Sequence, residues 1–333
     1  MDLFRRIFGK TSEEESPRQP LPADDSSSTV PIAVDTQVSE DLDELDPTTR
    51  PLGADLPPHM LANGVTQPLT REKLVAQRND HIAFGQATDV GLVRNNNQDS
   101  ALSLLYTSRS VDEQPDFGLF VVADGMGGHH DGERASAITT KVIASYIANH
   151  LFVPLLSGNN DVDQTPLTEA LVAAIQTANT EVIQQVPQGG TTVTSVIVVG
   201  DLAHIAHVGD SRAYLMTKDG IEQITRDHSL VQRLIELDQL TPEEAIDHPQ
   251  KNVLYRALGQ NESLEVDTLT RRLPADSRLL VCSDGLWGLI AESDIYEIAV
   301  NNSDPQQACD KLVALANTHG GVDNITAILL KIN

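Results

Sequence analysis

The order of the β-rich and helical segments limits the fold more than any other feature of this sequence. From about residue 80 onward, short β-rich runs are followed by two long helical patterns, then by further β-rich runs and a mixed C-terminal part. A doubly wound parallel sheet needs strands and helices in regular alternation, and this order does not provide it. The sequence therefore predicts an α+β fold in which antiparallel sheets carry helices on their outer faces. The β-rich runs are 81–88, 117–123, 191–200, 203–209, 212–217, 278–283 and 324–332.

Helical periodicity is clearest over residues 133–151, where Ile138, Val142 and Tyr146 recur at a spacing that places them on one face. A second helix is expected over 167–185. The three β-rich runs between 191 and 217 are separated by Gly-Asp pairs, so they predict an antiparallel meander. Shorter helices are expected at 229–237, 293–300 and 305–317.

The N-terminal part differs in composition. Residues 11–70 contain no aromatic Phe, Tyr or Trp, nine of the 17 prolines, and 12 acidic against 2 basic residues. Such a segment buries too little apolar surface to offset the entropy of ordering. We therefore expect residues 1–80 to be a disordered acidic tail rich in Pro, Ser and Thr, followed by one globular domain over 81–333. Thr48, Thr49 and Thr66 are candidate phosphorylation sites in this tail, and an unmodified linker is the alternative.

The charge balance and the cysteines restrict the partners and the compartment. A net charge of −25 argues against nucleic acid and against anionic membranes as partners. Cys282 and Cys309 form no CxxC pair, which fits a reducing compartment and predicts a cytoplasmic protein. No apolar stretch reaches the roughly 18 residues of a membrane span, so no transmembrane segment is expected.

Four aspartates stand where β-rich runs end or begin: Asp124, Asp210, Asp284 and Asp323. Any one of them is typical of a turn, because Asp and Gly are common turn residues. Brought together by a layered sheet, however, the four would form an all-oxygen cluster, which suits Mg²⁺ or Mn²⁺. Gly125 follows the first aspartate, and without a Cβ its carbonyl could approach such an ion closely.

Two other interpretations of the stretch VVADGMGGHHDGE are weaker. A Walker loop requires Gly-Lys-Ser/Thr, and a dinucleotide-binding loop requires a third glycine, and neither is present here. His129 and His130 lack an HExxH or cysteine partner, so we interpret them as exposed loop residues. Arg94 lies in a polar stretch beside Gln98 and Asp99, where a guanidinium could hold a phosphoryl group in a bidentate grip.

Eight stretches of this chain, in order, resemble the metal-dependent protein phosphatases, the type 2C serine/threonine family, and in particular its bacterial branch. They lie within residues 83–332: TDVGLVRNNNQDS, VVADGMGG, GGTTVTSVIV, AHVGDSRAYL, ITRDHSL, LYRALG, LLVCSDGLWG and GGVDNITAILL. The resemblance implies a four-layer α-β-β-α sandwich of two antiparallel sheets flanked by helices, with a metal centre at one end between the sheets. Residues 81–333 would then be the catalytic domain.

The resemblance also implies a ligand set for two Mn²⁺ or Mg²⁺ ions and for a third, weaker ion. Asp124 would bridge the two ions, and Gly125 would contribute its carbonyl oxygen. Asp284 and Asp323 would complete the ligands of the first ion. Asp210, together with Asp284, would support the third.

Arg94 would bind the substrate phosphate, and Asp99 would orient metal-bound water. Two positions depart from the wider family pattern. Gln98 occupies a place usually held by Glu, where an amide oxygen acting through metal-bound water would suffice. Met126 follows Asp-Gly where the eukaryotic branch has a proposed general-acid His, and we interpret Met126 as a mark of the bacterial branch.

The implied reaction is hydrolysis of phosphoserine and phosphothreonine in proteins by direct attack of a metal-bridging hydroxide. The expected partners are phosphoproteins, including a cognate Ser/Thr kinase and its substrates, and a phosphothreonine-binding partner for the tail. A catalytically weak scaffold that binds phosphoproteins is the alternative, and only Gln98 supports it. Residues 226–258 resemble the family's flap, where Arg226 and His228 would either touch substrate or have a structural role.

Overall fold

Two antiparallel β-sheets packed face to face form the centre of the structure, a computed structural model that describes residues 82–107, 116–128, 130–156 and 166–333. One sheet has the strand order β1-β11-β10-β7-β8. Its strands are β1 (Ile82–Asp89), β7 (Arg212–Thr217), β8 (Gly220–Gln223), β10 (Arg278–Cys282) and β11 (Ile325–Ile332). The predicted tail over 1–80, its three candidate threonines and His129 lie outside the described residues.

The second sheet has six strands in the order β2-β3-β5-β6-β9, with β4 paired to β3. Its strands are β2 (Asp99–Tyr106), β3 (Phe117–Met126), β4 (Gly190–Thr191), β5 (Val193–Val199), β6 (Leu202–Val208) and β9 (Asp267–Arg272). The prediction of a single meander over 191–217 is wrong. Strand β6 pairs with β5 and β9, whereas β7 pairs with β10 and β8, so the chain crosses between the sheets at Gly209 and Asp210.

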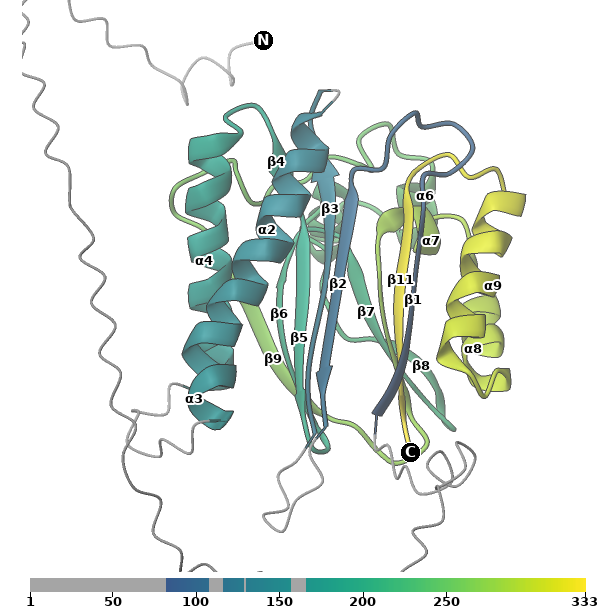
Figure 1. Cartoon of the computed structure of the whole chain (residues 1–333). Coiled ribbons are helices and arrows are strands. Elements are labelled where there is room, and N and C mark those ends of the chain that lie inside the picture. Colours follow the sequence, from purple (N-terminus) through teal and green to yellow (C-terminus); the bar gives the residue numbers. More distant parts are fainter. Residues whose placement is uncertain (1–81, 108–115, 129, 157–165) are drawn as a thin grey trace, which may run out of the picture. The chain divides into compact units, whose positions relative to one another are not determined.

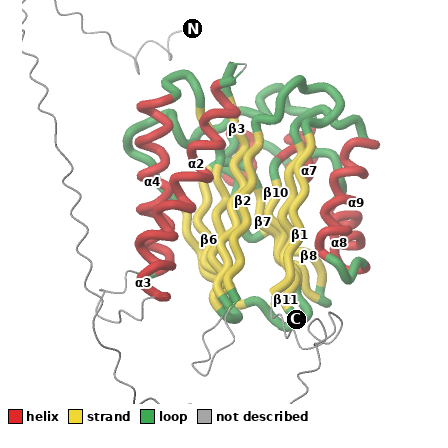
Figure 2. Tube along the Cα trace, in the orientation of Figure 1, coloured by secondary structure: helices red, strands yellow, loops and turns green. Residues whose placement is uncertain are grey.

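Helices cover both outer faces (Figures 1 and 2). Helices α2 (Asp131–Ile147) and α4 (Leu167–Gln185) pack on the six-stranded sheet, and α2 continues through a π-helical turn (Ala148–Phe152) into α3 (Val153–Leu156). Helices α8 (Glu292–Asn301) and α9 (Pro305–Thr318) pack on the five-stranded sheet. Three short helices complete the described part: α5 (Leu230–Glu236), α6 (Pro242–Ile246) and α7 (Asp284–Trp287). The predicted four-layer α-β-β-α sandwich is confirmed.

The strands read as continuous apolar runs because each central strand is covered on both faces. On β3, Phe120 and Val122 point into the core between the two sheets, whereas Leu119 and Val121 pack against the helices. This alternation is the period-two geometry of a strand with two buried sides. A one-residue slip in register would exchange the two faces, so the packing fixes the position of Asp124, two residues before the end of β3.

Among the described residues, no helix combines the length and the apolar character that crossing a membrane requires.

Candidate active site

The topology places the predicted aspartates at the same end of the sandwich. In antiparallel sheets the end of one strand lies beside the start of its neighbour. Asp99, the first residue of β2, is therefore directly opposite Asp124 near the end of β3. Asp210 follows β6, Asp284 begins α7 directly after β10 and Ser283, and Asp323 precedes β11.

The charges of these carboxylates act on one another. Burial raises the pKa of Asp124 well above its usual value, and the charges of four other aspartates, Asp99, Asp284, Asp210 and Asp323, raise it further. Burial likewise raises the pKa of Asp284, and Asp323 adds to this effect. The pKa of Asp210 is raised by burial and then by Asp284. Five carboxylates from separate elements thus share one site, and their charges disfavour the ionisation of four of them: Asp99, Asp124, Asp210 and Asp284.

This site fits a hard cation. Its donors are carboxylate oxygens, the ligands that Mg²⁺ and Mn²⁺ favour. Oδ1 of Asp99 and Oδ1 of Asp284 are buried and have no hydrogen-bond partner among the described residues. A cation would satisfy such oxygens and relieve the mutual repulsion. In the described residues, however, no three His, Cys, Asp or Glu side chains already surround one point as a complete ligand set.

Arg94 lies at the edge of the cluster and is bound to it. Its Nη2 donates to Oδ2 of Asp323 at 2.7 Å, and its side chain is 48% exposed. This hydrogen bond raises the pKa of Arg94, and the charges of Asp284 and Asp124 contribute as well. A guanidinium that is half exposed beside buried carboxylates remains open to an incoming anion.

Asp99 is held by a residue that the sequence did not indicate. Ser283 Oγ donates to Oδ2 of Asp99 at 2.7 Å and accepts from the backbone N–H of Thr326 at 3.0 Å. Ser283 therefore links β2 of one sheet to β11 of the other. It also precedes Asp284 directly, so one short segment fixes two carboxylates.

Asn324 is a second support that sequence reasoning missed, although it stands next to Asp323 in the GGVDN stretch. Its Nδ2 donates to the carbonyls of Val90 and Asn96, each at 2.9 Å, and its Oδ1 accepts from the N–H of Gln98 at 2.7 Å. Asn324 thereby fixes the loop that carries Arg94. The Gln98 side chain itself turns to the carbonyl of Gly127 at 3.4 Å.

Gly125 is required by its protein neighbours. A Cβ at this position would lie 2.1 Å from the carbonyl oxygen of Gly132 and 2.6 Å from that of Gln98. The backbone N–H of Gly125 also donates to Gln98 O at 3.1 Å. The close packing of three backbone segments therefore explains this glycine without any ion.

Asp124 is fixed through its own backbone. Thr192 Oγ1 accepts from its N–H at 3.0 Å, and Thr191 Oγ1 donates to its carbonyl at 2.8 Å. The two threonines lie at the end of β4 and immediately before β5.

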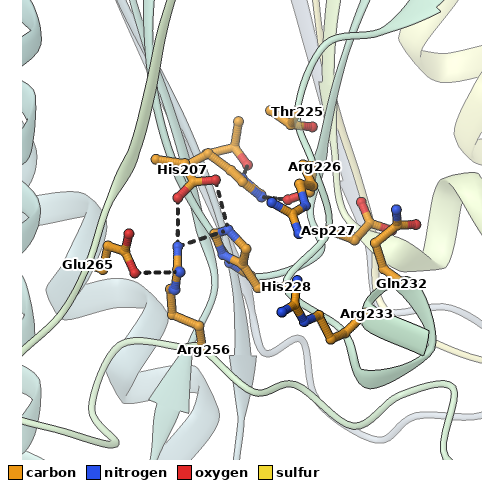
Figure 3. Close-up of polar contacts among 12 residues, drawn as sticks. His207, Thr225, Arg226, Asp227, His228, Gln232, Arg233, Arg256 and Glu265 are labelled. Atoms are coloured by element: carbon orange, nitrogen blue, oxygen red, sulfur yellow. Dashed lines mark hydrogen bonds and ion pairs between the residues drawn. The ribbon is translucent and has the colours of Figure 1, made fainter. Parts of the chain in front are cut away.

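His228 has a structural role, one of the two alternatives open at the sequence level. It is 1% exposed, and its ring Nδ1 accepts from the backbone N–H of Gly209 at 3.0 Å. The backbone N–H of His228 donates to the carbonyl oxygen of Gly209 at 2.7 Å. Figure 3 shows the ring beside the guanidinium of Arg256, which lies 3.2 Å from Nε2. His228 thus holds the residue that precedes Asp210.

Two other residues singled out in the sequence lie at the surface. Arg226 pairs with Glu236. His130 is exposed, as predicted, and contacts Glu133.

The comparisons with known proteins agree with this geometry. The family model described as protein phosphatase 2C matches residues 92–323. The serine/threonine phosphatase stp of Listeria innocua is 34% identical over 252 residues, which cover 74% of this chain and 94% of that protein.

Two solved structures show the same fold. The serine/threonine phosphatase of S. agalactiae superposes with a TM-score of 0.65 at 33% identity, covering 76% of this chain and 100% of that one. The catalytic domain of the serine/threonine protein phosphatase PstP, in complex with 2 manganese ions, superposes with a TM-score of 0.59 at 30% identity. The match covers 75% of this chain and 97% of that one. The chain belongs to the protein phosphatase 2C family.

Proposed function

We propose that this protein is a metal-dependent protein serine/threonine phosphatase that hydrolyses phosphoserine and phosphothreonine in proteins. The observation that carries this proposal is the group of five aspartates at one end of the sandwich, with the half-exposed Arg94 beside them. The matched relatives carry the name of this activity. Nothing in the described residues favours the phosphoprotein-binding scaffold.

The proposed metal ligands are Asp124, the carbonyl of Gly125, Asp284 and Asp323 for two ions, and Asp210 with Asp284 for a third. The PstP structure with 2 manganese ions supports Mn²⁺ as a suitable metal, and Mg²⁺ prefers the same oxygen donors. When bound, such ions supply an activated water and neutralise charge on the phosphoryl group.

The chain's own residues supply the remaining parts. Arg94 would bind two phosphoryl oxygens through its planar guanidinium. Asp99, whose Oδ2 is held by Ser283, presents its unpartnered Oδ1 to accept a hydrogen bond from the attacking water. Burial of Oδ1 of Asp99 strengthens this hydrogen bond, because the local dielectric is low.

Hydrolysis of p-nitrophenyl phosphate with Mn²⁺, and again after chelation by EDTA, tests this proposal. We expect turnover with the metal and none after chelation. Activity that survives EDTA would refute metal dependence. Calorimetric titration with Mn²⁺ measures the number of ions independently of turnover, and one ion in place of two would correct the ligand set.

The partners follow from the same reaction. We propose that the substrates are phosphoproteins, including a cognate Ser/Thr kinase and its targets, and that the two unpaired cysteines reflect a cytoplasmic location. Phosphorylated Thr48, Thr49 or Thr66 in the proposed tail would bind a phosphothreonine-reading partner. Mass spectrometry after co-expression with the kinase would detect these modifications, and unmodified threonines would contradict them.

A further inference from the structure

A cavity of about 590 Å³ opens directly beside the aspartate cluster. Asp210 and Asp284 belong to its lining, so it is continuous with the proposed active site. Most of the other lining residues come from two sides. One side is formed by Trp287, the last residue of α7, and the four residues after it, and the other by helices α5 and α6.

The side formed by Trp287 is rigidly held. Its Nε1 donates to the carbonyl of Asp210 at 3.0 Å, and the guanidinium of Arg212 lies 3.5 Å from the centre of its ring. Arg212 is itself bound to Asp227, with Nη2 and Oδ2 2.8 Å apart. This wall is therefore formed before any ligand arrives.

The opposite side presents apolar side chains that do not contribute to the core. Val231 and Ile235 lie one turn apart on α5 and line the cavity, as does Ile246 on α6. Neither helix has a fully buried residue, and Ile246 is 66% exposed. These aliphatic groups face the cavity, where a ligand could cover them.

We propose that this cavity binds an aliphatic side chain of the phosphoprotein substrate, located within about three residues of the phosphorylated residue. The inference rests on the proposed function, because a phosphate at the aspartate cluster brings the flanking residues of an extended peptide, each advancing about 3.3 Å, past the cavity. The volume lies within the range of about 300–1,000 Å³ that is usual for ligand pockets.

The charges around the cavity favour an uncharged occupant. The lining carries both signs of charge, so a charged occupant of either sign would meet like charges: an acidic one Asp210, Asp227 and Asp284, and a basic one Arg212 and Lys251. The Lys251 ammonium donates to the carbonyl of Ile246 at 3.0 Å, so its charge stays close to the apolar side. Isoleucine or leucine would cover the exposed aliphatic groups without leaving a charge unpaired.

Phosphothreonine peptides that differ at one flanking position test the subsite. In each pair, leucine replaces serine at one of the positions from −3 to +3, and kcat/KM is measured with the full chain and Mn²⁺. At one position we expect leucine to raise kcat/KM about tenfold, the order usual for filling an apolar pocket. In Ile246→Ser and in the pocket-filling variant Ala245→Phe, this advantage should fall to about threefold or less.

Leu237→Ser is the matched control, because Leu237 is 49% exposed on the same segment but does not line the cavity. It should keep the leucine preference, and all three variants should hydrolyse p-nitrophenyl phosphate at the wild-type rate. Equal kcat/KM for every peptide pair, or an equal loss in the control, would overturn the subsite alone. A wild-type protein inactive on p-nitrophenyl phosphate and on all peptides would overturn the proposed function and the subsite with it.

Discussion

Arg94 and Asp323 form an ion pair at the edge of the aspartate cluster, with Nη2 and Oδ2 2.7 Å apart. The proposed phosphate-binding residue is thus in direct contact with a proposed metal ligand. A change in the charge at Asp323 therefore acts on the orientation of Arg94 as well. We expect phosphate binding and metal binding to be energetically coupled through this contact.

Replacing Arg94 should lower activity with little effect on stability. Arg94→Ala removes the bidentate donor, so kcat/KM for p-nitrophenyl phosphate should fall about 100-fold. The kcat/KM of Arg94→Lys should lie between those of the wild type and Arg94→Ala. Because the ion pair is half exposed, unfolding free energy should change by less than about 1 kcal/mol. Steady-state kinetics and urea denaturation measure the two effects. An Arg94→Ala enzyme with wild-type kcat/KM would remove Arg94 from the site.

Asp284→Asn should abolish turnover and yet stabilise the metal-free protein. The substitution removes one of several buried carboxylates that disfavour one another's ionisation. In EDTA we expect a gain of about 1 kcal/mol, or roughly 2–4 °C in Tm for a domain of this size. Thermal denaturation in EDTA and with Mn²⁺ gives the Tm of both proteins under both conditions. Mn²⁺ should raise the Tm of the variant less than that of the wild type. A variant that is destabilised in EDTA would contradict the repulsion.

Ser283→Ala should impair both the fold and the reaction. It leaves Oδ2 of Asp99 and the N–H of Thr326 without this partner, which costs about 1–3 kcal/mol for buried groups. Because Asp99 loses its orientation, kcat should also fall. Ser103→Ala is the control, since Ser103 donates to Gln86 Oε1 at 2.7 Å on β2, several residues beyond Asp99. An equal loss of kcat in both variants would refute the specific role of Ser283.

Gly125→Ala should be far more damaging than Gly128→Ala. A Cβ at Gly125 would lie 2.1 Å from Gly132 O, whereas a Cβ at Gly128 has no atom within 4 Å. Moving the backbone next to Asp124 should cost about 3 kcal/mol or more, and the control should change stability by less than about 1 kcal/mol. Urea denaturation measures the unfolding free energy of both variants. Equal values would show that the backbone around Gly125 accommodates a Cβ at little cost.

His207 should make the protein less stable in acid. Burial lowers the pKa of His207 to about 3, and the neighbouring His228 contributes. The unfolded chain binds a proton at this residue below about pH 6.5, and the folded protein does not, so unfolding free energy falls by about 1.4 kcal/mol per pH unit between these values.

The difference in unfolding free energy between the wild type and His207→Gln, measured from pH 7 to pH 5, isolates this residue from the titrating carboxylates. As the pH falls, the wild type should lose unfolding free energy relative to His207→Gln. His130→Gln is the control, because the His130 side chain is 80% exposed. A difference independent of pH would show that folding does not lower the pKa of His207.

The sequence alone predicted the fold class, because two long amphipathic helices and several apolar runs restrict how layers can pack. It also predicted most helix and strand positions, including Leu167–Gln185 as a helix and Arg212–Thr217 as a strand. It missed β2, β8 and β9, whose residues are only partly buried or exposed and therefore lack a strong apolar pattern. The short helices α3, α6 and α7 were missed for a similar reason, since one turn gives no periodicity.

The sequence by itself determined which residues could be ligands, since aspartates beside apolar runs are visible in the chain. Only the tertiary structure decided that β6 and β7 belong to different sheets, that Ser283 reaches Asp99, and that a cavity lies between α5 and Trp287. Strand partners and side-chain contacts join residues far apart in the chain: Asp99 and Ser283 are 184 positions apart, and Thr88 and Thr326 are 238 apart. Local propensity carries no information about such pairs, because their free energy arises only when the two sheets pack together.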